Sequence, residues 1–201
     1  MRLLVVGAGG HAKVVIDAAR AARIEVAGVV DPQPGDNLLG VEIAESPARF
    51  DADAFIIAIG NNRTRAAFFS EYLETGLRPA TVIHPSTVIA EGVTIGAGTF
   101  VAAGVVINVD TVIGDDAILN TSCTVDHDCI IGDHAHIGPM SGLCGGVRIG
   151  VGALLGVGCS VIPLRSVGDW AIVGAGSAVV DDVPDGDSHA GVPARSIRPV
   201  T

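Results

Sequence analysis

From residue 83 onward, the hydrophobic pattern of the chain repeats every six residues without an insertion. Each of seventeen consecutive units begins with an aliphatic residue, and the position four residues further on is small in nearly every unit, with Arg165 as the exception. A short fixed period with one aliphatic and one small position predicts a stacked parallel β-solenoid built from equivalent inward positions. The aliphatic positions are Ile83, Ile89, Ile95, Val101, Ile107, Ile113, Leu119, Val125, Ile131, Ile137, Leu143, Ile149, Leu155, Val161, Val167, Val173 and Val179.

The residues before this repeat follow a different pattern. Residues 3–6 form an apolar run typical of a buried strand, residues 7–12 form a glycine turn, and residues 12–23 have the apolar spacing of a helix. A second strand is expected over 24–30, ending at Asp31. This order predicts a Rossmann-like βαβ unit.

Two more strands and a second helix complete this first part. We expect a short strand over 38–43, another over 55–59, and a helix that carries Phe68, Phe69, Tyr72 and Leu73 and stops at Gly76. The chain is therefore predicted to have an α/β domain at 1–80 and an all-β parallel solenoid with a C-terminal tail at 81–201.

Composition and charge limit the classes of binding partner that are expected. The net charge is −10 with a single lysine, Lys13, which argues against nucleic acid. An anionic ligand would be held locally, by backbone N–H groups and a few arginines. No apolar stretch approaches the roughly 20 residues of a membrane span, so no membrane partner is expected.

The four cysteines are interpreted as packing residues rather than as disulfides or metal ligands. Cys123, Cys129 and Cys159 fall in the small inward position, whereas the place of Cys144 is less determined. This usage indicates a reducing, cytoplasmic compartment, and we expect no metal.

The glycine turn before the first helix predicts a nucleotide site. The helix N-terminus offers free N–H groups to a phosphate, and Asp31 falls where such folds place an acid that binds the ribose. Eighty residues are half of a dinucleotide fold, so a mononucleotide is favoured over NAD. Glycines that simply turn the chain are the alternative interpretation, although packing does not readily explain His11.

Candidate chemistry in the solenoid centres on three clustered histidines, His127, His134 and His136. In the phase of the repeat, His127 and Asp128 lie at a corner, from which both side chains can project. A carboxylate beside an imidazole makes the ring a stronger base, as removal of a proton from an amine or hydroxyl requires. A solvated corner pair without chemistry remains the alternative.

Four motifs, in order along the chain, resemble the PglD/NeuD/PerB group of bacterial sugar acetyltransferases, which are left-handed β-helix (hexapeptide repeat) enzymes. They are Gly-Ala-Gly-Gly-His at the start, Ile-Ala-Ile-Gly-Asn-Asn at 57–62, His-Asp-Cys at 127–129 and Gly-Val-Pro-Ala-Arg at 191–195. The resemblance implies a homotrimer with active sites between subunits, acetyl-CoA as co-substrate and a nucleotide-linked sugar held by the first domain.

The resemblance also assigns residues. The catalytic base falls on His127 and the acid that raises its basicity on Asp128, where many relatives carry Glu. Residues expected to contact acetyl-CoA are His136, Gly145, Val157, Ala175 and Arg195, the last at a position that is usually Lys. Residues expected to contact the sugar nucleotide are Gly9, Gly10, His11, Asp31, Pro32, Gly60 and Asn61.

The predicted function is acetyl-CoA-dependent N-acetylation of a nucleotide-linked amino sugar by direct attack of the amine, with uridine or guanosine as the base of the nucleotide. Three alternatives remain. The same residues could O-acetylate a sugar such as sialic acid. A zinc-dependent lyase would use three histidines, but the spacing His127-x6-His134-x-His136 does not fit that class. A sugar-nucleotide-binding protein without catalysis would not need His127.

Overall fold

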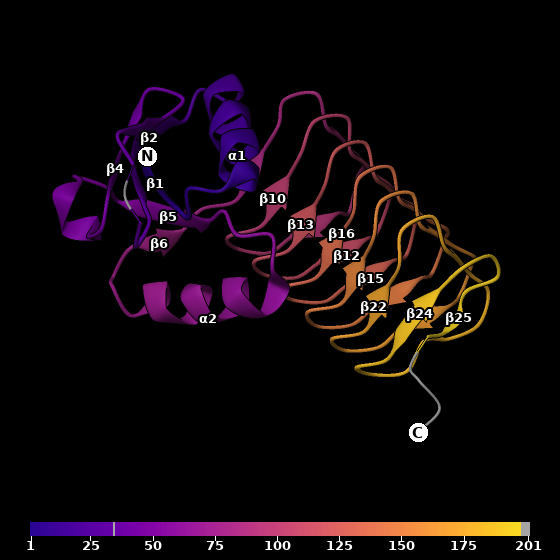
Figure 1. The fold of residues 1–201 in the computed structure, drawn as a ribbon. Coiled ribbons are helices and arrows are strands. Elements are labelled where there is room, and N and C mark those ends of the chain that lie inside the picture. Colours follow the sequence, from indigo (N-terminus) through magenta and orange to yellow (C-terminus); the bar gives the residue numbers. More distant parts are fainter. Residues whose placement is uncertain (34, 198–201) are drawn as a thin grey trace.

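The computed structural model describes residues 1–33 and 35–197, which form an α/β domain and a β-solenoid (Figure 1). The α/β domain lies against one end of the solenoid, and the coils run from there to the C-terminal strands. The expected fold class is confirmed: an α/β domain is followed by an all-β parallel solenoid. Within the described residues, no helix is long and apolar enough to cross a membrane.

The sheet of the α/β domain has the strand order β3-β4-β2-β1-β5-β6. All neighbours are parallel except β3 and β4. The strands are β1 (Arg2–Val6), β2 (Glu25–Val30), β3 (Asn37–Leu38), β4 (Val41–Ala44), β5 (Ala54–Ile57) and β6 (Arg78–Pro79), and the helices are α1 (Gly10–Ala21), α2 (Asn62–Leu73) and the 3-10 turn η1 (Pro47–Arg49).

The two long helices cover opposite faces of this sheet, as Figure 1 shows. Alternate residues of β1 separate the two cores: Leu3 and Val5 pack with the buried face of α1, whereas Leu4 and Val6 pack with Phe69 of α2. A strand buried on both faces has to be apolar throughout, which explains the continuous run at the N-terminus.

The prediction of one short strand over 38–43 is wrong, because the chain forms a hairpin there. Strands β3 and β4 pair antiparallel around a two-residue turn. Both turn residues, Leu39 and Gly40, have positive φ angles of 51° and 77°. Such a turn reverses the chain tightly and matches the twist of the flanking strands. An apolar residue at the first turn position hid this reversal in the sequence.

The solenoid has three parallel sheets. The first contains β7 (Val82–Ile83), β10 (Phe100–Val101), β13 (Ile118–Leu119), β16 (His136–Ile137), β19 (Leu154–Leu155), β22 (Ile172–Val173), β24 (Ser188–Ala190) and the antiparallel β25 (Arg195–Ser196). The second contains β8 (Val88–Ile89), β11 (Val106–Ile107), β14 (Thr124–Val125), β17 (Gly142–Leu143), β20 (Ser160–Val161) and β23 (Ala178–Val179). The third contains β9 (Thr94–Ile95), β12 (Val112–Ile113), β15 (Ile130–Ile131), β18 (Arg148–Ile149) and β21 (Ser166–Val167).

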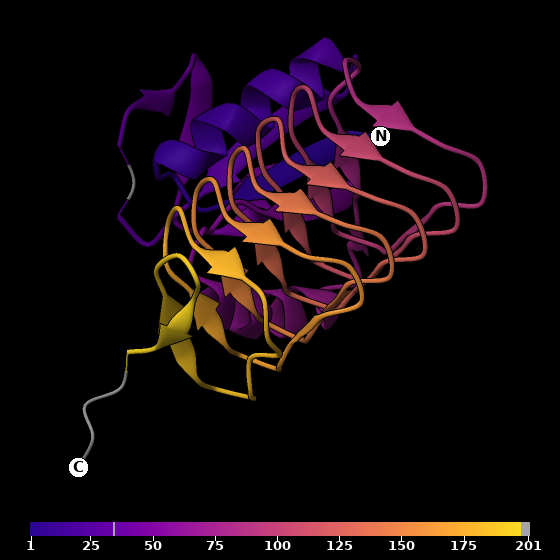
Figure 2. The same ribbon diagram turned by 90° about the vertical axis from the view of Figure 1, so that its right-hand side faces the viewer.

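Each coil is three hexapeptides long, since Phe100 pairs with Ile118 and Ile118 with His136. Figure 2 shows these coils stacked as successive rungs. The inward aliphatic residues are buried from Val101 onward, whereas Ile89 in the first coil is 39% exposed. The period of six therefore reports one side of a three-sided prism.

The small inward positions do more than fill space. Thr111 donates a hydrogen bond to the carbonyl of Asp126 at 2.8 Å, and Ser141 donates to that of Gly156 at 2.9 Å. Cys129 and Cys159 make the same contact with weaker S–H donors. These side chains satisfy corner carbonyls inside a narrow core, where an unpaired carbonyl is costly. The packing interpretation of Cys123, Cys129 and Cys159 agrees with their complete burial.

The corners are two-residue turns whose second residue has a left-handed backbone. Asp128 and His134 occupy this position with φ angles of 58°. Glycine and aspartate are common at this position because they adopt positive φ at little cost. The corners thereby place functional side chains at a defined spacing along the outside of the prism.

Candidate active site

His127 and Asp128 form a hydrogen-bonded pair at the corner between the second and third solenoid sheets. His127 Nδ1 lies 2.7 Å from Asp128 Oδ2. Because a carboxylate can only accept, Nδ1 carries the proton and the lone pair of the ring lies on Nε2. Within the described part of the chain no group bonds to Nε2, and both side chains are more than half exposed. The corner position and the pairing of these two residues, both predicted from the repeat, are thus present in the structure.

The surroundings of His127 make it more basic. The hydrogen bond with Asp128, followed by the negative charge of Asp126, raises the pKa of His127 above its ordinary value of 6.5. Asp126 is held in place because its Oδ1 accepts hydrogen bonds from the His127 backbone N–H and from the Asn108 side chain, each at 2.9 Å. Two carboxylates therefore favour the protonated ring that proton abstraction would produce.

Gly145 lies one coil further along the same corner, directly against the imidazole. A Cβ atom built on Gly145 would stand 2.5 Å from Cε1 and 2.6 Å from Nε2 of His127. Only glycine leaves room for the ring in this orientation. The residue expected from the resemblance to line acetyl-CoA thus also restricts where the imidazole of His127 can lie.

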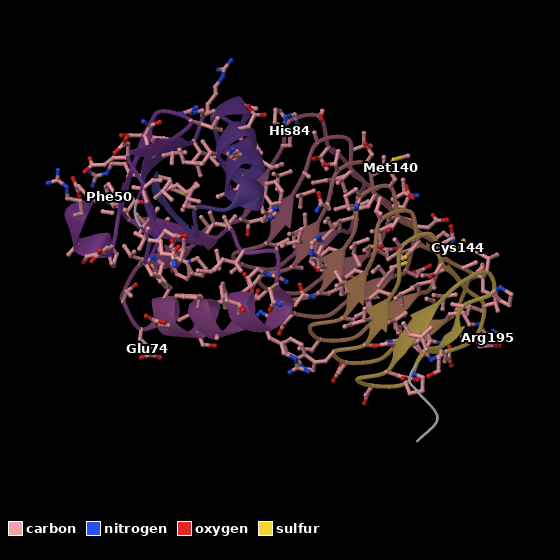
Figure 3. The ribbon with its side chains drawn as sticks, in the orientation of Figure 1. Phe50, Glu74, His84, Met140, Cys144 and Arg195 are labelled. Atoms are coloured by element: carbon pink, nitrogen blue, oxygen red, sulfur yellow. The ribbon has the colours of Figure 1, made fainter. Side chains whose placement is uncertain are left out.

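A groove of about 420 Å³ runs along this corner past His127 and Gly145 to Leu164. Cys144 lines it as well and is exposed. The interpretation of all four cysteines as packing residues is therefore wrong for Cys144. Its side chain lies on the solenoid, well away from Phe50 and Glu74 of the α/β domain (Figure 3).

The glycine turn leaves open space above the N-terminus of α1. A Cβ atom on Gly9 or Gly10 would have no atom within 4 Å, and no side chain caps the helix. Asp31 has a structural role that the sequence did not reveal: its carboxylate accepts hydrogen bonds from the backbone N–H groups of Ala8 at 2.8 Å and Gln33 at 2.9 Å. The acid thereby ties the glycine turn to the end of β2.

A pocket of about 330 Å³ opens beside this turn, between the carboxyl ends of β1 and β2 and the helix α2. Asp31 and Pro32 line it, with Ile59, Phe68 and Tyr72 on the opposite side. Ligands of parallel α/β sheets bind at the carboxyl ends of the strands. The two expected substrate residues at the end of β2 therefore face a real cavity.

His11, Gly60 and His136 meet between the α/β domain and the first solenoid sheet. The rings of His11 and His136 lie 6.5 Å apart, and His11 packs edge-on against Phe100. His136 Nε2 accepts a hydrogen bond from the Asn120 amide at 3.0 Å, and Nδ1 donates to the Gly60 carbonyl at 3.4 Å. His11 and Gly60, which the resemblance assigns to the sugar nucleotide, are thus neighbours of His136, which it assigns to acetyl-CoA.

Burial keeps both rings of this cluster neutral. It lowers the pKa of His11 to about 4 and that of His136 to about 4, and the positive charge of Arg65 acts in the same direction on each. His11 Nε2 is buried and has no hydrogen-bond partner among the described residues. Buried polar atoms are rarely left unpaired, so this atom lacks the partner that folding normally supplies.

The remaining expected residues lie at other corners. Val157 and Ala175 occupy the corner between the first and second sheets on successive coils, and both are exposed. Arg195 pairs with Asp181 at 3.2 Å and is exposed. The side chain of Asn61 accepts a hydrogen bond from the Thr64 backbone and caps α2. None of these four contacts His127.

The three clustered histidines do not converge on one point. His127 pairs with Asp128, His134 pairs with Asp116 at 2.8 Å, and His136 bonds to Asn120. Each ring thus has a different partner and a different place on the coil. This arrangement does not support the zinc-dependent lyase as an alternative function.

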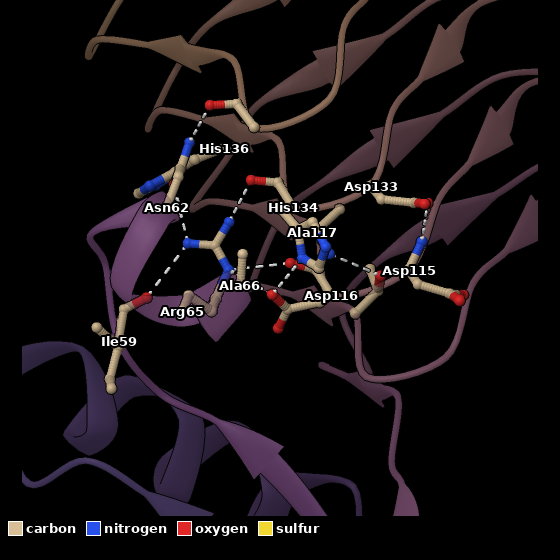
Figure 4. A network of polar contacts seen from close by, with 12 residues as sticks. Ile59, Asn62, Arg65, Ala66, Asp115, Asp116, Ala117, Asp133, His134 and His136 are labelled. Carbon is tan, nitrogen blue, oxygen red and sulfur yellow. Dashed lines mark hydrogen bonds and ion pairs between the residues drawn. The ribbon is translucent and has the colours of Figure 1, made fainter. Parts of the chain in front are cut away.

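The largest fully buried side chain of the described residues, Arg65, was missed from the sequence (Figure 4). Its Nε bonds to the backbone carbonyl and the carboxylate of Asp116, and its Nη atoms donate to the carbonyls of Ile59 and His134 and to the side chain of Asn62. Burial raises the pKa of Asp116, although Arg65 and His134 both favour its charged form. The network joins α2 to the solenoid and holds the loop that carries Gly60.

These contacts follow a single corner, between the third and first sheets, over successive coils. Its left-handed positions are Gly98, Asp116, His134, Gly152 and Trp170. Phe69 occupies the space beside Gly98, Asn62 donates to the carbonyl of Gly152, and Arg63 stacks on Trp170 at 4.5 Å. Because equivalent corners are 18 residues apart in sequence, no local pattern identifies this docking surface.

Two parts of the candidate site therefore lie on different sides of one chain. His11 and His136 lie at the first solenoid sheet, and the pocket beside Asp31 lies within the α/β domain, whereas His127 lies at the corner between the second and third sheets. In a three-sided prism, that corner is the edge opposite the first sheet. His127 is consequently remote from His11 and from the pocket beside Asp31 of the same chain.

Comparison with known protein families places both parts of the chain. Residues 2–72 match the PglD N-terminal domain, and residues 75–108 and 110–145 match the bacterial transferase hexapeptide (six repeats).

Solved structures match over almost the whole chain. A histidine-to-asparagine variant of perosamine N-acetyltransferase from Caulobacter crescentus, in complex with CoA and GDP-perosamine, is 41% identical, with a TM-score of 0.96 over 99% of this chain and 98% of that one. The acetyltransferase domain of PglB from Neisseria gonorrhoeae, in complex with acetyl coenzyme A, is 33% identical, with a TM-score of 0.91 over 98% of each chain. WeeI from Acinetobacter baumannii is 29% identical, with a TM-score of 0.90 over 98% of this chain and 100% of that one.

Proposed function

This chain belongs to the PglD/PerB group of left-handed β-helix sugar acetyltransferases, and we propose that it transfers the acetyl group of acetyl-CoA to the amino group of a nucleotide-linked amino sugar. The observation that carries the proposal is the pair of His127 and Asp128 on a groove of the solenoid, in a chain whose first domain has an open glycine turn and a pocket beside it. N-acetylation is favoured over O-acetylation because the 41% identical relative is a perosamine N-acetyltransferase.

The proposed reaction is a direct attack. The lone pair of the sugar amine forms a bond to the thioester carbonyl carbon, and the carbonyl oxygen takes the negative charge. His127 Nε2 accepts the proton that the amine loses, and Asp128 stabilises the resulting imidazolium through Nδ1. The carbon–sulfur bond then breaks, and the coenzyme thiolate takes up the proton from His127. The products are the N-acetyl sugar and free coenzyme A.

The two proposed substrates bind to different parts of the chain: the nucleotide-linked sugar to the α/β domain and acetyl-CoA to the solenoid. The nucleotide occupies the pocket beside Asp31 and Pro32, and its diphosphate lies at the uncapped N-terminus of α1, near Gly9 and Gly10. The sugar extends toward His11, whose unpaired Nε2 supports a contact there. Acetyl-CoA lies along the solenoid, with Gly145, Val157, Ala175 and Arg195 as its proposed contacts and His136 near its thioester.

A complete site needs a second copy of the chain, because the base and the nucleotide pocket lie on different sides of one copy. We propose a homotrimer in which His127 of one subunit faces the pocket of the next. Exposed apolar side chains on the second and third sheets, Val88 at 60%, Val112 at 45% and Ile130 at 39%, support association there. A monomeric mass by light scattering at micromolar concentration contradicts this assembly.

The base is tested by substitution. His127→Ala should lower kcat by roughly 10²–10⁴ and leave acetyl-CoA binding nearly unchanged, because the ring accepts a proton only during the chemical step. Asp128→Asn should cost less. Release of free coenzyme A with a nucleotide-linked 4-amino sugar is the assay, and near-normal turnover of His127→Ala refutes the mechanism.

Cys144 offers a covalent route that has to be excluded, because it is exposed in the same groove as His127. Direct attack predicts that Cys144→Ala still acetylates the sugar and that no radiolabelled acetyl group stays on the wild-type protein. Loss of all turnover in Cys144→Ala, together with a labelled protein, supports an acetyl-cysteine intermediate instead.

Mixing two inactive variants tests the shared site. His127→Ala lacks the base, and Gly10→Val blocks the helix N-terminus where the phosphate is proposed to bind. If each site combines two subunits, random reassembly of equal amounts restores about a quarter of the sites. Recovery of activity after mixing is the expected result, and its complete absence, with mixed trimers demonstrated by mass spectrometry, refutes the shared site.

A further inference from the structure

The pocket beside the glycine turn has the chemistry to select one base. This inference rests on the proposed function, which places a nucleotide there. The walls of the pocket are apolar and come from both sides: Pro32 and Pro47 on one side, and Ile59 and Phe68 on the other. Such walls bury the faces of a planar ring and leave its edge to the polar side chains.

The polar side chains at the pocket are mainly hydrogen-bond acceptors. Glu45, just after β4, and Glu71, on α2, both line the cavity. Ionised carboxylates accept hydrogen bonds and donate none. No lysine, arginine, asparagine or glutamine is among the described residues that line this cavity.

Of the other polar side chains at the pocket, Asp31 and Thr75 are already engaged, and the neutral phenol of Tyr72 can donate as well as accept. Both oxygens of Asp31 hold backbone N–H groups. The Thr75 hydroxyl donates to the carbonyl of Tyr72 at 2.6 Å and accepts from the Leu77 N–H. Glu45 and Glu71 therefore supply the free charged groups that can read the edge of a base.

The bases differ in what their edges offer to a carboxylate. Guanine has two adjacent donors, the N1–H and the N2 amino group, which one carboxylate can receive together. Uracil has a single N3–H between two carbonyl oxygens, and both oxygens are acceptors that a carboxylate repels. Unpaired acceptors facing each other in a partly dry pocket are costly. We propose that this pocket binds guanine, so that the substrate is a guanosine-diphosphate-linked sugar.

The inference is tested by measuring how tightly the intact protein binds nucleoside diphosphates that carry no amino sugar. Isothermal titration calorimetry with GDP, IDP and UDP separates the contributions of the two guanine donors to binding. IDP keeps the N1–H of guanine and lacks the N2 amino group. GDP should bind at least roughly tenfold more tightly than UDP, and IDP should fall between them, as expected for loss of one hydrogen bond to a charged group. Equal affinity for GDP and UDP, or a preference for UDP, overturns the inference.

Two variants locate the contact. Glu45→Gln and Glu71→Gln keep the size of each side chain and remove its charge; at least one should reduce the preference for GDP over UDP roughly tenfold or more. Glu74→Gln is the matched control, since Glu74 is an exposed glutamate at the end of α2 that does not line the pocket. An unchanged preference in both pocket variants overturns the inference even if GDP binds better than UDP.

The outcomes separate this inference from the proposed function. Tight binding of UDP, with acetylation of a uridine-diphosphate-linked amino sugar, overturns the guanine inference and leaves the acetyltransferase standing. Absence of binding by all three nucleotides at millimolar concentration overturns both the nucleotide pocket and the guanine inference.

Discussion

A single methyl group at Gly145 should disable the base without unfolding the protein. Gly145 contacts the ring of His127 from the next coil, and an alanine Cβ would stand 2.5 Å from Cε1. Ordinary contact requires 3.4 Å or more, so the ring has to retreat by about 1 Å. The backbone of Gly145 lacks the positive φ of its neighbour Gly146, so alanine fits the backbone there.

The magnitude follows from that displacement. The ring is the exposed end of a side chain, so it moves rather than breaking the coil, and the 2.7 Å hydrogen bond to Asp128 is stretched. A misplacement of about 1 Å in a catalytic group costs on the order of 10²-fold in rate. Gly145→Ala should therefore lower kcat by about 10²-fold with little change in melting temperature.

Steady-state release of coenzyme A at saturating substrates measures kcat, and circular dichroism measures the fold. The matched control is Gly142→Ala in the same coil, whose Cβ would meet Thr124 Oγ1 at an ordinary 3.5 Å. The control should keep its kcat. A kcat of Gly145→Ala within twofold of the wild type refutes the requirement for this ring position, and an equal loss in Gly142→Ala attributes the effect to the coil rather than to His127.

Three further predictions follow from the charges in the structure. The acid limb of the kcat/KM profile should have its midpoint above pH 6.5, because the base works as the neutral ring and its pKa is raised; Asp128→Asn should shift the midpoint to lower pH, and an unmoved limb contradicts the role of the pair. Arg65→Met should reduce the free energy of unfolding in urea by about 3–5 kcal/mol, because it leaves the carboxylate of Asp116 buried without its guanidinium. Adding Asp116→Asn should recover part of this loss, and an unchanged free energy of unfolding in Arg65→Met shows that the network contributes little. Stability should fall as the pH is lowered from 6.5 to about 4, because His11 and His136 take up protons in the unfolded chain and resist them in the folded one; His11→Gln with His136→Gln should flatten the fall, and identical pH dependence in this double variant and the wild type refutes it.

The sequence alone determined the solenoid and the corner pair. The repeat is local, because the inward position of each hexapeptide is identified by its own aliphatic residue. Stacking of identical units then leaves few alternative arrangements. From the same phase, His127 and Asp128 could be placed side by side on a corner, because they are adjacent in the chain. The glycine turn and the strands around it were equally readable, since their apolar runs and turn residues are contiguous.

Tertiary structure decided which residues from distant coils share a contact. Arg65 bonds to carbonyls of Asp116 and His134, which lie 51 and 69 residues away, and a buried arginine in a helix leaves no periodic signal. The contact of Gly145 with His127 also depends on stacking, because the two residues are 18 positions apart in the chain and only the packing of successive coils brings the glycine against the ring. Spacing along a chain predicts local geometry, but the partners of a side chain depend on how separate elements pack, and here the docking of α2 along one corner decides them.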